Sequence, residues 1–296
     1  MDHPGLVEIS LVGDIGAFDY FISGQVLEGK NASTEIGDIQ VASNIDAGEF
    51  SKLYEYWLSY EFASLDGVMT VGQMDLNNKF AYADNASEFL NSSMGISPTI
   101  FTVPTYPEPA LSLVYEQHLG ANYSLAGTVS AGAGNDDFSD LFYMLEWRYH
   151  SDTIGLKAGG WHHTGELTAL DGHIEDSSEG WYAVLEGQLT SMPVGYYAQY
   201  GYTDKRLTEI TQHVGAGITA RHFLLNHNAV TGVGVTAARL SELTDTQRRW
   251  ETVAEVFVKF QINDALSLKP DIQYVMSPAG DDRNVWVSTL RVALSF

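Results

Sequence analysis

The sequence predicts an all-β protein, a transmembrane antiparallel β-barrel of about 16 strands with one long loop folded inward. Segments of about ten residues with alternating apolar and polar side chains recur along the 296-residue chain and end at Gly, Asp, Asn or Pro. Short turns alternate with longer polar connections, and the chain ends in a strand whose last residue is Phe296. Residues 1–296 are therefore predicted to form a single barrel domain.

The composition agrees with a barrel that crosses the membrane with strands. No run approaches the ~20 apolar residues of a spanning helix. The mean hydropathy of -0.09 suits a barrel, because only every second strand residue meets lipid. The 16 Tyr, 13 Phe and 6 Trp residues supply side chains for interfacial girdles. Cysteine is absent, which excludes disulfides and thiolate metal sites.

The formal net charge of -23 makes nucleic acid a poor partner and argues against an anion-selective pore. Residues 1–4 look like an initiator methionine placed at the start of a mature or trimmed chain. We therefore do not take the lack of a secretory signal as an argument for a cytoplasmic location, and we expect the bacterial outer membrane.

The strand candidates follow one another from end to end with no helical segment between them. Residues 141–150 and 153–163 are joined by the tight turn Ser151-Asp152, and 181–190 and 194–203 by residues 191–193. The weakest candidate is 38–45. The full set is 6–13, 18–27, 38–45, 52–62, 67–75, 111–119, 122–131, 141–150, 153–163, 181–190, 194–203, 213–221, 229–240, 252–262, 266–275 and 285–296.

Alternation gives each strand one oily and one polar face. In residues 141–150, Leu145 and Trp147 share one face, and Glu146 and Arg148 share the other. A soluble sandwich would bury the oily face between two sheets. The end-to-end repeat and the unequal connections favour the membrane barrel over that alternative.

One connection departs from the pattern. After Asp75 the alternation stops, and residues rich in Asn, Ser, Phe and Pro follow until strands resume at Ala110. A connection of this length within a domain is uncommon and usually functional. We expect residues 75–109 to fold into the lumen and narrow the pore. The aromatic residues of this loop, such as Phe80, would form either a patch in the constriction or a small core of the loop itself.

Residues 37–109 and the C-terminal end resemble the carbohydrate-selective porins of the OprB type. The resemblance rests on an ordered set of motifs, with further similarity in residues 266–278 and the final LRVALSF. The chain departs from the family in having Met94 at a position that is more often aromatic. The motif residues are Gly37-Asp38, Ser43-Asn44-Ile45, Leu53-Tyr54-Glu55, Trp57, Val71-Gly72-Gln73, Asp75, Phe80, Phe89, Asn91-Ser92-Ser93, Gly95 and Tyr106-Pro107.

This resemblance implies a passive channel for small carbohydrates or similar neutral solutes. Weak contacts at several places would let a sugar leave as well as enter. Taken singly, each charged candidate could instead serve only to balance charged neighbours on adjacent strands in a water-filled interior. The pore-lining candidates, from alternation and from the loop, are Glu55, Trp57, Glu61, Asp75, Phe80, Glu116, Glu146, Arg148, Lys157, Glu186, Lys259, Lys269, Asp271 and Arg291.

The implied partners are membrane lipids and lipopolysaccharide, small sugars and, as one option for the assembly, two further copies in a homotrimer. A general cation-preferring porin and a surface scaffold barrel without transport remain alternatives. We expect no enzyme, cofactor or metal site. His162 and His163 are adjacent on a strand and point to opposite faces, and no G-x-S-x-G motif occurs.

Overall fold

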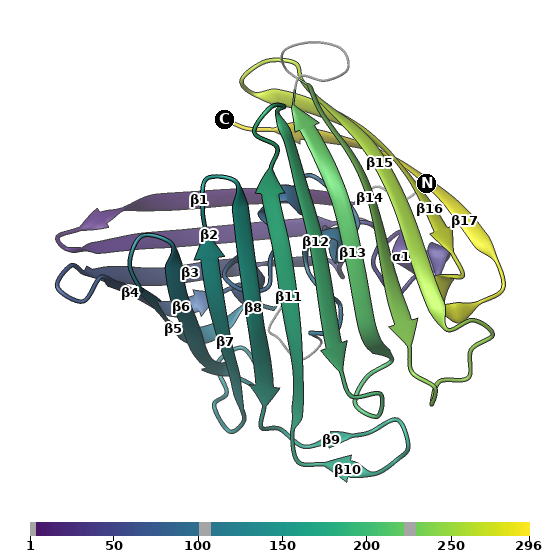
Figure 1. The fold of residues 1–296 in the computed structure, drawn as a ribbon, viewed down its shortest axis with the longest axis horizontal. Helices are drawn as coiled ribbons and strands as arrows, with labels where there is room; N and C mark the ends of the chain where they lie inside the picture. Colours follow the sequence, from purple (N-terminus) through teal and green to yellow (C-terminus); the bar gives the residue numbers. More distant parts are fainter. Residues whose placement is uncertain (1–3, 101–107, 222–228) are drawn as a thin grey trace.

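The computed structural model describes residues 4–100, 108–221 and 229–296. In this part of the chain, 15 strands form one antiparallel sheet in which each strand pairs with the next (Figure 1). The strands are β1 (Gly5–Ile15), β2 (Phe18–Glu28), β3 (Phe50–Phe62), β4 (Gly67–Met74), β5 (Ala110–His118), β6 (Tyr123–Ala131), β7 (Leu141–His150), β8 (Ile154–His163), β11 (Ser178–Gln188), β12 (Val194–Thr203), β13 (Ile210–Arg221), β14 (Ala229–Leu240), β15 (Trp250–Gln261), β16 (Leu266–Met276) and β17 (Asn284–Leu294).

The remaining elements are short and lie in the connections. A separate hairpin between β8 and β11 pairs β9 with β10 (Figure 1). Within the residues that the structure describes, no helix has the length and apolar character needed to cross a membrane. These elements are β9 (Leu167–Thr168), β10 (Ile174–Glu175), α1 (Ser33–Ile36), α2 (Ser92–Gly95), η1 (Leu76–Asn78), η2 (Asp84–Ala86) and η3 (Pro278–Gly280).

The sheet curves into a barrel wall. The alternation predicted from sequence gives this wall different outer and inner faces. On β7, Leu145 and Trp147 are exposed on the outside at 58% and 39%. Phe142, Met144 and Glu146 are buried on the inside. An outward apolar face and an inward mixed face are the pattern of a barrel in lipid. The predicted all-β antiparallel barrel is thus confirmed.

The strand prediction is wrong at one of its 16 segments. Residues 38–45 form no strand but part of an irregular connection that begins with the short helix α1. The other 15 predicted segments correspond to the 15 strands of the sheet. The weakest prediction failed because this segment is fixed by contacts with strands far along the chain, which are described below.

The two edge strands of the sheet, β1 and β17, run in the same direction. This follows from the odd number of strands, because consecutive strands are antiparallel. No pairing between β1 and β17 occurs in the described part of the chain. Both edges carry exposed apolar side chains, including Ile9 at 70% and Leu290 at 64%.

Candidate functional site: the lumen and two inward segments

Two connections, not one, fold against the inner face of the wall. The predicted segment does so through its described residues 75–100, and residues 101–107 lie outside the described part. The second connection is 29–49, between β2 and β3. The two are joined by backbone hydrogen bonds from Asn44 N–H to the Leu90 carbonyl (2.7 Å) and from Ser92 N–H to the Val41 carbonyl (3.0 Å).

Glutamates on the wall hold the segment 75–100 by accepting hydrogen bonds from its backbone N–H groups. They come from four strands in turn, β3, β7, β11 and β15, so the segment is fixed along its length. Carboxyl oxygens are good hydrogen-bond acceptors for backbone N–H groups. The contacts are Glu55 with Asp75 (3.0 Å), Glu146 with Ala81 (2.7 Å), Glu186 with Asn85 (3.1 Å), and Glu255 with Leu90 (2.6 Å) and Asn91 (3.1 Å).

A further wall glutamate fixes the segment 29–49 in the same way. The Glu251 carboxylate accepts hydrogen bonds from Ile39 N–H (3.0 Å) and Gln40 N–H (2.9 Å). The amide of Gln273 donates to the Ala42 carbonyl at 2.8 Å. Sequence analysis missed Glu251, Glu255 and Gln273 as functional candidates. The signal available was their polar side chains on the inward positions of otherwise apolar strands.

Wall cations bind the carbonyl groups of the same segment. Their side chains are therefore only partly available to a solute. The donor and carbonyl pairs are Arg148 with Lys79, Lys157 with Tyr82 (2.7 Å) and Lys269 with Glu88 (2.7 Å). Lys259 and Lys269 also form ion pairs with the Glu88 carboxylate, each at 2.7 Å. Burial raises the pKa of Glu88, but hydrogen bonds from these two lysines outweigh burial and hold it below its usual value.

Two non-glycine residues adopt left-handed backbone conformations where the segments are held. Val41 has φ 57° and Ala81 has φ 58°. This region is unfavourable for a β-branched residue such as valine and persists only where surrounding contacts enforce it. The Val41 carbonyl accepts the bond from Ser92, and Ala81 N–H donates to Glu146. The strain therefore lies at the points where contacts fix the two segments.

The start of the segment 75–100 is positioned by an irregularity in β3. The pairing of β2 with β3 shifts register between Ser23 and Gly24, which leaves Tyr54 as an extra residue. Tyr54 and Glu55 are both buried as a result. The Tyr54 hydroxyl donates to the Asp75 carboxylate at 2.9 Å. Burial raises the pKa of Asp75 to about 6.

Phe80 lies in a packed core between the segment and the wall. It is 1% exposed and belongs to a buried cluster with Leu76, Phe142 and Trp161. The Arg148 guanidinium lies over its ring at 5.6 Å. Phe80 therefore lies neither in an open aromatic patch nor in a core formed by the loop alone, because residues of the wall complete the cluster.

The other sequence candidates take different positions. Trp57 stacks on Phe21, with ring centroids 5.4 Å apart. Glu116 forms an ion pair with Arg148 at 2.6 Å. Glu61 is exposed near the end of β3. Asp271 is 2% exposed and accepts a hydrogen bond from Gln273, and Arg291 donates to the Ser43 hydroxyl at 3.1 Å.

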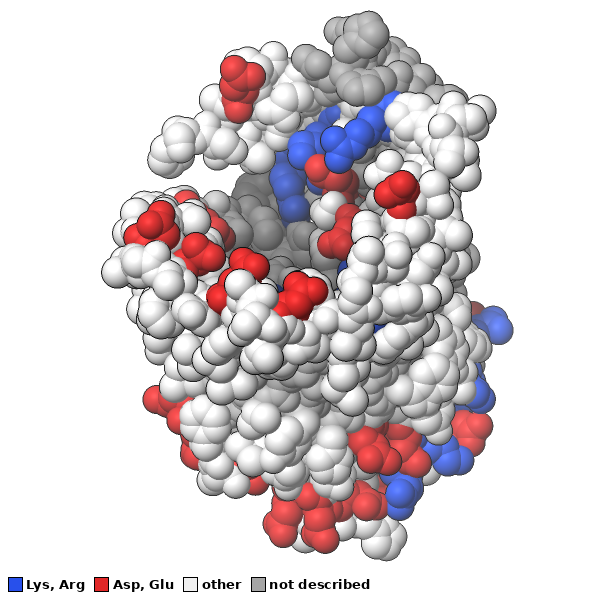
Figure 2. All heavy atoms as spheres, turned by 60° about the vertical axis from the view of Figure 1, so that its left-hand side comes forward, with Lys and Arg blue, Asp and Glu red and all other residues white. Residues whose placement is uncertain are grey.

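Two cavities adjoin the inward segments. One, of about 630 Å³, lies between both segments and the wall strands β1, β2, β3 and β17. The other, of about 500 Å³, extends from residues 84–88 to the wall strands and short turns around Gln188, Pro193 and Asp264. Ser87 lines both cavities. Figure 2 shows a hollow in one face of the molecule, with acidic and basic side chains on its walls.

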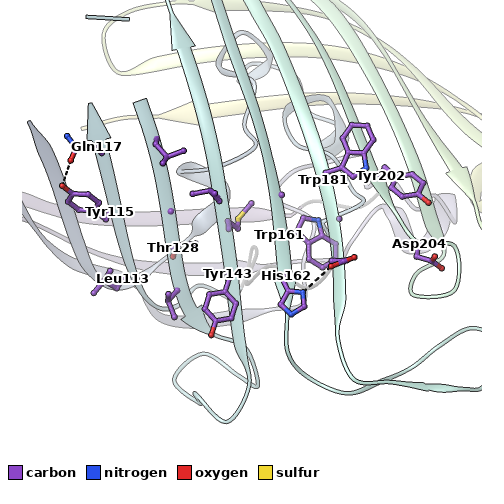
Figure 3. Close-up of a pocket in the computed structure, with 18 residues that line it drawn as sticks. Leu113, Tyr115, Gln117, Thr128, Tyr143, Trp161, His162, Trp181, Tyr202 and Asp204 are labelled. Carbon is purple, nitrogen blue, oxygen red and sulfur yellow. Dashed lines mark hydrogen bonds and ion pairs between the residues drawn. The ribbon is translucent and has the colours of Figure 1, made fainter. Parts of the chain in front are cut away.

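A third hollow, of about 1030 Å³, lies mainly on the outer face of the wall over β5–β8, β11 and β12 (Figure 3). Its lining is largely apolar, with Leu125, Leu145 and Trp181 around Gly127 and Gly160. The hollow therefore faces the lipid side and is separate from the lumen cavities.

The histidines considered from sequence lie in different surroundings. Within the described ranges, no group of three or more His, Cys, Asp or Glu side chains is arranged to hold a metal ion. His162 lines the outer hollow near Glu179, and His163 contacts the Gly132 carbonyl. These two histidines do not form a common site.

The fold is that of bacterial outer-membrane porins. The structure is similar to that of OprB from Pseudomonas putida at high pH, with a TM-score of 0.88, 15% sequence identity, and coverage of 100% of this chain and 88% of that chain. It is also similar to OmpF of Salmonella typhi (TM-score 0.65, 12% identity, 97% and 89% coverage). A third similar structure is the outer-membrane channel DcaP of Acinetobacter baumannii (TM-score 0.61, 10% identity, 98% and 84% coverage).

The sequence itself identifies the family. The pattern of the OprB family, described as carbohydrate-selective porins, matches residues 146–296, just over half of the chain. The chain belongs to this family. The match includes the C-terminal resemblance noted from sequence but not residues 37–109. No curated protein matches the sequence. Family and fold point to a channel in the outer membrane of Gram-negative bacteria, rather than to an enzyme.

Proposed function

We propose that this porin allows passive diffusion of small carbohydrates, and that they pass the inward segments through the two lumen cavities. The observation that carries this proposal is that Ser87 lines both cavities. A solute would enter beside β1–β3 and β17, pass Ser87 and leave near the short turns. The volume of about 630 Å³ lies within the range of about 300–1,000 Å³ typical of small-molecule sites.

The lining chemistry of the larger cavity supports a neutral polyol. The exposed side chains of Asn44 and Asn78 offer amide donors and acceptors for sugar hydroxyls. The rings of Phe21 and Tyr82 offer apolar surfaces for the C–H faces of a sugar. Contacts of this kind are individually weak, which suits conduction because a solute must leave as easily as it enters.

The experiment is single-channel recording of the purified protein in a planar bilayer, with and without glucose or maltodextrins. We expect steps that a sugar blocks in a dose-dependent way. Asn44 is exposed to the cavity, so Asn44→Leu should weaken the block. The matched control is Asn122→Leu in the turn between β5 and β6, which should leave the block unchanged. Open channels whose current no sugar blocks would contradict the proposal. Bilayers that show no channel current would favour a surface scaffold barrel without transport.

A further inference from the structure

The charged residues that line the larger lumen cavity are mostly acidic. Four carboxylates, Glu8, Asp46, Glu55 and Asp75, face one cation, Arg291, among the described lining residues. These residues come from β1, β3, β17 and both inward segments, so carboxylates lie on more than one side of the cavity. The acidity is therefore a local property of this cavity as well as of the whole chain.

Three lysines on the wall are paired elsewhere and do not line this cavity. Lys157 pairs with Asp84 at 3.0 Å and with Glu186 at 3.1 Å. Lys259 and Lys269 pair with Glu88 at 2.7 Å. None of these cations lines the larger cavity. In contrast, the ion pairs found among the described residues include none of the four cavity carboxylates.

One of the four carboxylates, Glu8, is open to a passing solute. Glu8 is exposed, and its carboxylate accepts a hydrogen bond from the Gln25 amide at 2.7 Å. Asp46 is half-buried. Its Oδ2 accepts hydrogen bonds from Ser33 N–H at 3.1 Å and from the Ser33 hydroxyl at 3.3 Å, and its Oδ1 is buried without a hydrogen-bond partner, so this residue acts on the cavity through its charge. Asp75 is deeper, and its pKa of about 6 leaves it mostly ionised above pH 7.

We propose that this cavity discriminates by charge, admitting neutral and amino sugars and rejecting sugar acids and sugar phosphates. The inference rests on the proposed function. Between low-dielectric walls, carboxylates that outnumber the nearby cations repel an anion more strongly than they would in open water. An ammonium group in place of a sugar hydroxyl would gain from the same field. Glu8 is the specificity-determining residue that a solute meets, and Asp46 contributes its charge to the lining of the cavity.

The test measures the reversal potential in a potassium chloride gradient at pH 7.5, together with current block by glucosamine, glucose and gluconate. The double variant Glu8→Gln/Asp46→Asn removes two charges with little change of shape. We expect the potassium-to-chloride permeability ratio to fall by about twofold or more, because two negative charges are removed from the lining of the cavity. Block by glucosamine should weaken, and block by glucose should change little.

The matched control is Glu179→Gln, which removes a charge from a side chain that is 79% exposed beside the outer hollow. It should leave the permeability ratio unchanged. Glu8→Gln alone serves if the double variant does not fold, because Glu8 is exposed. A chloride-preferring channel, or a double variant that behaves like the control, would overturn the inference while leaving a porin. Complete absence of channels would overturn the proposed function and this inference with it.

Discussion

Buried wall glutamates are the residues on which the lumen depends. Glu146 is fully buried and accepts hydrogen bonds from Ala81 N–H at 2.7 Å and the Tyr182 hydroxyl at 2.8 Å. It also pairs with the Arg148 guanidinium. Burying a carboxylate is costly unless its charge and lone pairs are matched. Here one side chain provides a partner for a loop N–H, a phenol and a cation at once.

We expect Glu146→Ala to destabilise the barrel by about 1–3 kcal/mol, because it leaves the buried Ala81 N–H and Tyr182 hydroxyl without their acceptor, whereas Arg148 keeps its ion pair with Glu116. Glu146→Gln should cost less, since an acceptor remains. The measurement is denaturant unfolding in detergent, with Glu166→Ala as the exposed control in the β8–β11 connection. Equal stability of Glu146→Ala and the control would show that the network contributes nothing.

At this scale the sequence predicts the side on which a residue lies but not its partner. Alternation on β7 correctly places Glu146 and Arg148 on the inward face. The partner of Glu146 is the N–H of Ala81, 65 residues earlier, in a segment without regular structure. No local pattern encodes such a contact, because any inward carboxylate could accept from any inward N–H.

At the scale of elements, the two inward segments behave as one layer across the lumen. Period-two alternation predicts the 15 strands because each has a lipid face. The same rule fails for residues 38–45, where Ile39 and Val41 have the spacing of a strand although no strand forms. Hydrogen bonds to Glu251, 212 residues away from Ile39, decide the structure instead. The long 75–109 connection was predictable, since loss of alternation after Asp75 is visible in the sequence.

Within the segment 75–100, the two ends of one shorter stretch lie close together. Ala83 N–H donates to the Gly95 carbonyl at 2.9 Å, so residues 84–94 form a loop whose two ends are joined by a hydrogen bond. Replacing them with a short glycine link should raise single-channel conductance and weaken sugar block, because material is removed between the two cavities. The control replaces residues 169–173 between β9 and β10, outside the sheet. Unchanged conductance would mean that solutes do not pass this segment.

For the whole molecule, the decisive feature is that β1 and β17 run in the same direction. An antiparallel ladder cannot form between them, and a parallel ladder is not present in the described residues. In a membrane, unpaired backbone groups at such edges are unfavourable. The barrel therefore has one stretch of wall that differs from all the others, and the larger lumen cavity lies beside it.

Cysteine crosslinking tests directly whether β1 and β17 pair with each other, because the chain has no native cysteine. Ile9→Cys combined with Leu290→Cys should remain unlinked under mild oxidation. The control pair Leu11→Cys and Ile22→Cys, which are register partners on β1 and β2, should form a disulfide. Efficient linkage across β1 and β17 would instead demonstrate direct parallel closure.

The contacts of the inward segments also constrain the order in which the protein can fold. Gln40 reaches its final partner only when Glu251 is in place, and Leu90 requires Glu255. Both glutamates lie on β15, among the last three strands of the sheet. The wall must therefore be nearly complete before the lumen is filled. During insertion, the barrel would pass through a wide, unobstructed state whose narrowing is the final step of assembly.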